Sequence, residues 1–172
     1  RSAFSASSPV SMVASSNELH VAAFREHPEF NSFRGRLTLV RSPYLLDYTL
    51  EQQIYDTQLV PQIRRHVAPH ATYTAALWAV LTRLRRPHAD KYVLPKLGRI
   101  ASDLSPLEKA DAYAHGSIPQ RFDSDDAKQL RSGIEAIYAE ADGFPVYEGV
   151  TGASPREVRT LLLDAAQNGD RT

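Results

Sequence analysis

The 172-residue chain has no cysteine and only one methionine and one tryptophan, and its charges cancel to a formal net charge of zero. The lack of cysteine excludes disulfides and cysteine-ligated metal sites. The zero net charge gives no overall field that would attract nucleic acid or an anionic membrane. No apolar run approaches the roughly 20 residues that a transmembrane helix needs, and the Ser-rich start lacks the apolar stretch of a signal peptide. These absences favour a cytoplasmic protein.

Several catalytic motifs are also missing from the sequence. There is no Gly-rich phosphate loop that ends in Lys-Ser or Lys-Thr, no GxGxxG, no GxSxG and no HExxH. His66 and His70 are four residues apart, but Pro69 lies between them and no acidic cluster is near, so we predict no metal site. Because the chain begins without methionine and both ends look abrupt, we expect a piece of a longer protein.

The first 48 residues predict a strand, a helix and a second strand. Residues 9–16 and 37–44 alternate apolar and polar side chains, which is typical of half-buried strands. Between them, Asn17 is placed to cap a helix that runs to about residue 26. A short basic turn around Gly35 precedes the second strand.

From residue 49 onward the sequence predicts helices. They cover residues 49–65, 71–86, 105–114, 123 onward and 154 onward. The first begins with a capping box at Thr49 and places Leu50 and Ile54 on its apolar face, and Pro61 kinks or splits it. Residues 87–104 lack a sustained period and predict a loop or an insertion.

Two of these helices begin with the same pattern, Ser-Pro-x-Glu, at Ser105 and Ser154. The serine caps the helix, the proline suits the first helical position and the glutamate completes a capping box. Arg156 is unexpected in the second copy, because a cation in the first turn meets the positive end of the helix dipole.

Three polar features are candidates for a binding or catalytic role. Asn17 follows a predicted strand, where it can orient a water or a phosphate oxygen or simply cap the helix. Arg34 and Arg36 flank a glycine, which suits bidentate phosphate recognition or a solvated basic turn. Arg156 either faces solvent, pairs with Glu157, or joins the helix N–H groups in binding an anion.

The order of these features resembles AAA+ ATPases, in which they are called sensor 1, the arginine finger and sensor 2. Residues 15–55 are similar to the PrkA family of bacterial AAA+ proteins, which are named serine protein kinases. The shared features are SNE at the strand end, an F-x-x-R turn, PY and EQxIY, followed later by VLTRL and YEGVTGASPREV. GASPR also resembles the sensor-2 motif of MoxR and magnesium-chelatase relatives.

The resemblance covers about residues 10–167 and implies a mainly α fold. Residues 1–48 would be a remnant of an AAA+ α/β core, with two strands and a helix, and residues 49–172 an all-helical lid. The lid would carry a possible insertion at 87–122 and sensor 2 at 152–159. Walker A and Walker B would lie upstream of residue 1, so we expect these 172 residues to be inactive alone and to hold no cofactor.

The resemblance also implies roles for the candidate residues. Asn17 would be sensor 1 and orient the attacking water, and Arg156 would be sensor 2 and contact the γ-phosphate. Arg36 would be the arginine finger that acts on a neighbouring subunit. Gly35 stands where many AAA+ proteins have Asp, so Arg34 is the alternative finger.

The same resemblance implies cofactors and partners for the longer protein. It would use ATP and Mg²⁺, form a homo-oligomeric ring in the cytoplasm and act as an ATPase or an ATP-dependent protein kinase. A protein substrate fits this class, whereas no membrane partner is expected and nucleic acid is disfavoured.

A rival interpretation is a non-enzymatic helical interaction or DNA-binding domain. Five arginines cluster near two predicted helix ends: Arg64, Arg65, Arg83, Arg85 and Arg86. Cations at helix C-termini are favoured in any case, and the zero net charge weakens the case for nucleic acid.

Overall fold

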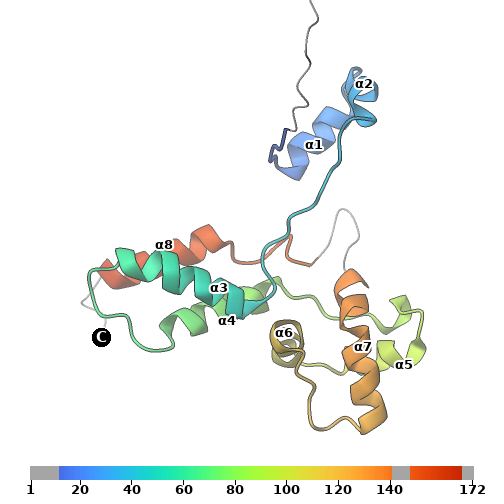
Figure 1. Cartoon of the computed structure of the whole chain (residues 1–172), viewed down its shortest axis with the longest axis vertical. Coiled ribbons are helices and arrows are strands. Elements are labelled where there is room, and N and C mark those ends of the chain that lie inside the picture. The colour runs from blue at the N-terminus through green and yellow to red at the C-terminus, as the bar shows by residue number, and fades with distance from the viewer. Residues whose placement is uncertain (1–11, 141–147, 168–172) are drawn as a thin grey trace, which may run out of the picture. The chain divides into compact units, whose positions relative to one another are not determined.

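The computed structural model describes residues 12–140 and 148–167, and all regular elements in these two ranges are helical (Figure 1). The chain divides into two compact units, of which one ends at Arg41 and the other begins at Ser42. The first unit contains α1 (Glu18–Arg25) and α2 (Phe30–Arg34). The prediction of a mainly α chain is therefore confirmed.

The second unit contains the remaining helices. These are α3 (Tyr48–Ile54), the π-helical turn η1 (Tyr55–Leu59), the 3₁₀ turn η2 (Val60–Gln62), α4 (Ala71–Arg83), the 3₁₀ turn η3 (Ala89–Lys91), α5 (Pro95–Ser102), α6 (Pro106–His115), α7 (Ser124–Glu140) and α8 (Pro155–Gln167). The helix that begins at Tyr48 changes from α to π to 3₁₀ geometry before it ends, and Pro61 lies in its last turn. The predicted disturbance at Pro61 is thus a change of helix type.

The two predicted strands are wrong for the described residues. Residues 9–11 lie outside the described ranges, and residues 12–16 and 37–44 have no strand or helix. A strand is stable only when a neighbouring strand satisfies its backbone N–H and C=O groups. The Tyr44 amide does donate to the Gly149 carbonyl (3.0 Å), but this is a single bond to a loop. Alternation alone therefore did not suffice to define a sheet.

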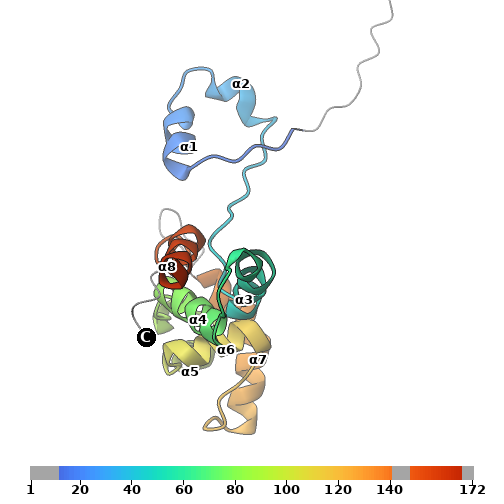
Figure 2. The same cartoon turned by 90° about the vertical axis from the view of Figure 1, so that its left-hand side faces the viewer.

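The first core of the second unit lies among α3, α4, α6 and α8 (Figures 1 and 2). Helix α4 packs on both α3 and α8, and α6 packs on α3 and α4. The buried apolar side chains come from all four helices and η1: Tyr48, Tyr55, Leu59, Ala76, Ala79, Val80, Ala110 and Val158. Because α4 touches the other three, it is the central helix of this group.

The second core joins α5 to α7. It is built from Leu97, Ile100, Ala101, Leu104, Leu130 and Ile137. Gly133 lies in the middle of α7, where an added Cβ would come within 2.6 Å of the Leu97 side chain. The intrinsic cost of a helical glycine, about 1 kcal/mol, is therefore offset by a close approach of the two helices. Tyr113 of α6 packs against this second core, and its ring centroid lies 5.2 Å from that of Tyr138 in α7.

Two local predictions need correction in this unit. The predicted loop at 87–104 contains α5, whose apolar residues are buried in the second core. Helix α3 is capped by Asp47 instead of Thr49: Asp47 Oδ1 accepts from the amides of Thr49 (2.8 Å) and Leu50 (3.3 Å). None of the helices in the described ranges combines the length and the apolar character needed to cross a bilayer.

Candidate functional site

The start of α8 is the best-defined candidate position. The Ser154 amide donates to the Glu157 carboxylate (2.7 Å) and the Glu157 amide donates to Ser154 Oγ (3.2 Å), which is the predicted capping box. The hydrogen bond from the Ser154 backbone, and then that from its side chain, lowers the pKa of Glu157. Glu157 is therefore held as an anion at its own helix start.

Arg156 lies between these two residues of the capping box and is exposed. Within the described ranges its guanidinium makes no hydrogen bond or ion pair, since Glu157 bonds to Ser154. Of the interpretations left open by the sequence, pairing with Glu157 is thus not observed. An exposed guanidinium at a helix start is free to bind an anion such as a phosphate oxygen.

The segment that leads into α8 is fixed against the end of α4. The Gly149 amide bonds to the Arg83 carbonyl (3.4 Å), and the Ala153 amide bonds to Thr82 Oγ1 (2.9 Å). Gly152 has φ +104°, and an added Cβ would lie 2.7 Å from the Thr82 carbonyl oxygen. This close approach of two backbones explains why the glycine of GASPR precedes the helix.

A buried arginine lies directly under this segment. The Arg83 side chain is 1% exposed; its Nε donates to the Ala153 carbonyl (2.8 Å) and its Nη1 donates to the Leu45 carbonyl (2.8 Å). Both Nη atoms also bond to the Glu51 carboxylate, with Nη2 at 2.8 Å from Oε1. Tyr55 donates its hydroxyl to the same carboxylate. Burial, followed by this hydrogen bond, raises the pKa of Tyr55.

A second buried ion pair fixes the beginning of the same segment. Lys109 Nζ lies 2.5 Å from Glu148 Oε1 and also donates to the Arg85 carbonyl (2.6 Å). Glu148 accepts further bonds from the Arg85 amide (2.7 Å) and the Tyr113 hydroxyl (2.9 Å). Burial, and next the charge of Glu148, raises the pKa of Tyr113. Residues 148 and 153 are thus each anchored by buried charge.

The other candidate residues lie in the first unit. Asn17 precedes α1, where its carbonyl accepts from the His20 and Val21 amides, but its side chain makes no capping hydrogen bond. The strand that would have placed Asn17 at a sheet edge is not formed. Arg34 ends α2 and Arg36 follows Gly35, and all three candidate side chains are exposed. Arg156 belongs to the second unit, so the structure groups only Asn17, Arg34 and Arg36 in one unit.

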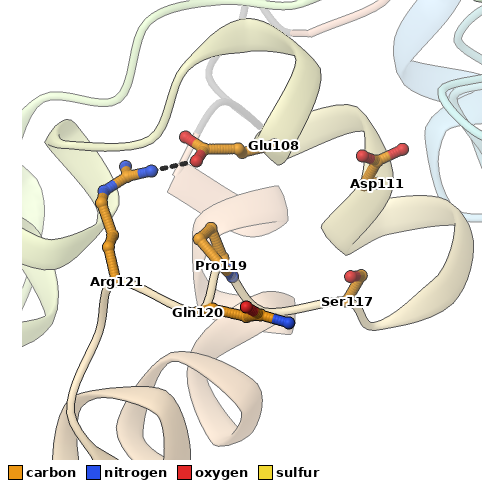
Figure 3. Close-up of a pocket in the computed structure, with 6 residues that line it drawn as sticks. All are labelled: Glu108, Asp111, Ser117, Pro119, Gln120 and Arg121. Carbon is orange, nitrogen blue, oxygen red and sulfur yellow. Dashed lines mark hydrogen bonds and ion pairs between the residues drawn. The ribbon is translucent and has the colours of Figure 1, made fainter.

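A small polar cavity of about 230 Å³ lies beside α6 and the loop after it (Figure 3). Its lining residues are Glu108, Asp111, Ser117, Pro119, Gln120 and Arg121. The Arg121 guanidinium lowers the pKa of Glu108 to about 2 by a direct ion pair. Asp111 accepts a hydrogen bond from the buried Tyr48 hydroxyl (2.8 Å). The cavity contains none of the candidate residues, and its charged groups are explained by these contacts.

Sequence reasoning missed the buried pair of Arg83 and Glu51. Arg83 is one of the five arginines that the sequence offers as a possible DNA-binding cluster, and its burial removes it from that cluster. A signal was present, because Thr72, Ala76, Ala79 and Arg83 follow one another at helical spacing and are all buried. Within the described ranges, no group of three or more His, Cys, Asp or Glu side chains is arranged to hold a metal ion.

Comparisons with known proteins support the family resemblance. A family model described as the PrkA AAA domain matches residues 4–91, which is just over half of the chain. The ATP-dependent protease PrkA of Bacillus subtilis (strain 168) is 24% identical over 149 residues, which are 86% of this chain and 20% of that protein. The chain therefore spans about a fifth of the length of this curated relative. No solved structure gives a significant match.

Proposed function

Because the chain belongs to the PrkA family of AAA+ proteins, we propose that it is the part of an ATPase that senses nucleotide and responds to it. In this proposal a longer, oligomeric protein binds ATP and Mg²⁺ through motifs that these 172 residues do not contain. The chain contributes Arg156 to nucleotide bound in its own subunit. Asn17 orients the attacking water, and Arg36 reaches nucleotide in the neighbouring subunit.

The exposed Arg156 at the start of α8 is the observation that carries this proposal. Phosphoryl transfer depends mainly on positioning and on stabilisation of negative charge. Arg156 supplies a guanidinium in a first turn where Glu157 does not neutralise it. The family-model match ends at residue 91, so the role of Arg156 rests on the GASPR motif and on this geometry.

Arg36 and Asn17 complete the proposed set from the first unit. Both side chains are exposed, and Arg36 follows the last helical residue of α2 by two positions. Exposure suits a residue that acts on a neighbouring subunit. Arg34 stays the alternative finger, because it is exposed as well.

The output of the ATPase is proposed to be ATP-driven work on a protein substrate. The Bacillus subtilis relative carries the name of an ATP-dependent protease, and the family resemblance includes the name of serine protein kinases. We favour conformational work on the substrate, as the resemblance to AAA+ ATPases implies. Incubation of the full-length protein with a labelled protein substrate and ATP distinguishes three outcomes. The substrate is phosphorylated, is cleaved, or is unfolded with its covalent structure unchanged.

The test of the proposed site replaces Arg156 by alanine in the full-length protein. Loss of one charge-assisted hydrogen bond costs about 1.5–3 kcal/mol, so we expect ATP turnover per bound nucleotide to fall by about 10- to 100-fold. Arg159→Ala is the matched control, because Arg159 lies one turn later in α8 and bonds to the Gln62 side chain (3.2 Å). Unchanged turnover and unchanged nucleotide affinity in Arg156→Ala would contradict the proposal.

The arginine finger is tested by mixing subunits. Arg36→Ala subunits should lose hydrolysis on their own, and by analogy with GTPases the loss can reach about 10³-fold. Mixing them with subunits that lack a functional phosphate loop should restore activity, because each partner supplies what the other lacks. If Arg34→Ala subunits instead lose hydrolysis and regain it on mixing, while Arg36→Ala subunits do not, then Arg34 is the finger.

A further inference from the structure

Arg83 joins three segments that are far apart in the sequence. One guanidinium contacts the Leu45 carbonyl just before α3, the Glu51 carboxylate within α3 and the Ala153 carbonyl just before α8. Ala153 is three residues from Arg156. Leu45 belongs to residues 42–47, which connect α3 to the unit that ends at Arg41.

The geometry of this contact fixes both backbone segments. The guanidinium is planar and carries its donors in a rigid fork, so bonds to two carbonyls and one carboxylate define its position. Tyr55 holds the carboxylate from the other side. Tyr44 lies over the guanidinium, with its ring centroid 5.3 Å from Arg83 Cζ, and its amide bonds to the Gly149 carbonyl.

Stability alone does not explain a buried ion pair in this position. Apolar residues of similar volume often replace such pairs without loss, and sometimes with a gain in stability. An apolar side chain, however, cannot bond to the carbonyls of Leu45 and Ala153. The particular property of Arg83 is therefore that it connects these two backbone segments.

We propose that Arg83 is a positioning residue that transmits a change at Arg156 to residues 42–47. This inference rests on the proposed function, in which Arg156 contacts a nucleotide phosphate. A shift of the α8 start moves the Ala153 carbonyl, Arg83 follows it, and the Leu45 carbonyl follows Arg83. Residues 42–47 then report the state of the nucleotide to the unit that carries Asn17 and Arg36.

Amide hydrogen exchange of the full-length protein tests this transmission directly. A non-hydrolysable ATP analogue with Mg²⁺ should slow exchange both at residues 153–158 and at residues 42–47. In the variant Arg83→Met/Glu51→Leu/Tyr55→Phe, which removes the charges and the hydroxyl together, the response at 153–158 should persist and that at 42–47 should be lost. Leu130→Ala, in the second core, is the control that lowers stability without touching Arg83, and it should keep both responses.

A mutant cycle gives an independent readout. Arg83→Met/Glu51→Leu/Tyr55→Phe should lower ATP turnover by about tenfold or more, because small misplacements of reacting groups are costly, and should lower it no further in an Arg156→Ala background. Arg83→Lys, which keeps the charge but lacks the planar fork, should show an intermediate loss and covers the case in which the triple variant does not fold.

The outcomes separate this inference from the proposed function. A wild-type response at residues 42–47 in the triple variant, or losses that add to those of Arg156→Ala, would overturn the role of Arg83 and leave that of Arg156 intact. No response at residues 153–158 in the wild-type protein would overturn both.

Discussion

The two units of the chain differ most in what they bury. In the first unit neither α1 nor α2 has a buried residue, and Met12, Val13 and Leu19 expose 90%, 97% and 76% of their surface. Its aromatic side chains do contact one another, with Phe24 and Phe30 edge to face and their ring centroids 5.3 Å apart. The second unit instead encloses two apolar cores and two ion pairs that are almost fully buried.

This difference indicates which unit is held together by contacts among its own residues. The helices of the second unit bury apolar side chains in two cores, although Trp78, Val93 and Leu161 stay 48%, 96% and 56% exposed. The first unit has exposed apolar side chains but no buried residue in either helix, and exposed apolar surface favours contact with another segment or chain. The comparison predicts that mutations of equivalent type have much larger effects on stability after Ser42 than before Arg41.

The largest difference is expected between Arg83→Met and Arg34→Met. Removing Arg83 leaves the Glu51 carboxylate buried and unpaired, which costs about 3–5 kcal/mol. Arg34 is exposed, and a surface substitution changes stability by about 0.5 kcal/mol or less. Urea unfolding followed by circular dichroism measures both. Equal midpoints for the two variants would contradict the structural importance of the buried pair.

The next comparison uses leucine to alanine in each unit. Leu130 is fully buried in the second core, and its truncation should cost about 2–5 kcal/mol. Leu19 is 76% exposed, so Leu19→Ala should stay within about 0.5 kcal/mol. Thermal unfolding measures the stability of both variants. A loss of stability in Leu19→Ala as large as that in Leu130→Ala would show that α1 is covered in solution.

Replacing a glycine by alanine is expected to change stability less, and in opposite directions in the two units. Gly152 combines φ +104° with a Cβ position 2.7 Å from the Thr82 carbonyl oxygen, so Gly152→Ala should destabilise by about 1–3 kcal/mol. Gly35 has φ −77° and nothing within 4 Å of its Cβ position, so Gly35→Ala should stabilise by up to about 1 kcal/mol. Differential scanning calorimetry distinguishes the two directions. Destabilisation by Gly35→Ala would indicate a neighbour at that turn.

The smallest effect is expected at the exposed ion pair beside the cavity. Arg121 lowers the pKa of Glu108 from 4.5 to about 2. A lowered pKa gives stability that is present above about pH 4.5 and is lost as the pH falls toward 2. Arg121→Gln should therefore weaken the chain at neutral pH by less than about 1 kcal/mol, and this effect should fade as the pH falls through about 2. Carboxyl titration by NMR should show the pKa of Glu108 returning toward 4.5, and a value still near 2 would contradict this assignment.

Local signals in the sequence predicted the parts of the fold that depend on local interactions. Both Ser-Pro-x-Glu starts form the expected capping boxes, at Ser105 and Ser154. A capping box depends on residues within four positions of one another, so its sequence pattern is sufficient to predict it. Leu130 and Ile137 also lie on the buried face of α7 as predicted.

The sequence-based predictions failed where the structure depends on contacts between residues that are far apart in the sequence. Leu50 and Ile54 were expected in the core but are 49% and 40% exposed, because α3 turns Glu51 inward to Arg83 and η1 turns Tyr55 inward to Glu51. No pattern around Glu51 predicts that its carboxylate is buried, since its partner Arg83 lies 32 positions away in the sequence. Helix α5 was missed because it is only eight residues long, although Leu97, Ile100, Ala101 and Leu104 follow helical spacing.

The candidate site was only partly accessible to the same reasoning. The GASPR motif and the exposure of Arg156 were within reach of the sequence and the family resemblance. The network that holds residues 148–153 was not, because it depends on Lys109, Glu148 and Arg83 meeting in space. The functional roles of Asn17, Arg36 and Arg156 stay predictions that the variants above can test.

The capping box of α8 also limits how an anion can be bound there. Pro155 has no amide hydrogen, and the amides of Ser154 and Glu157 are already bonded within the box. Of the first turn, only the Arg156 amide lacks a partner within the described residues. The helix start therefore cannot act as a nest of several N–H donors, and the proposed binding of a phosphate would depend on the Arg156 guanidinium. Binding by a single guanidinium depends more on the charge of the anion than on its shape, so it is sensitive to ionic strength. A small rotation of the side chain is enough to make or break the contact.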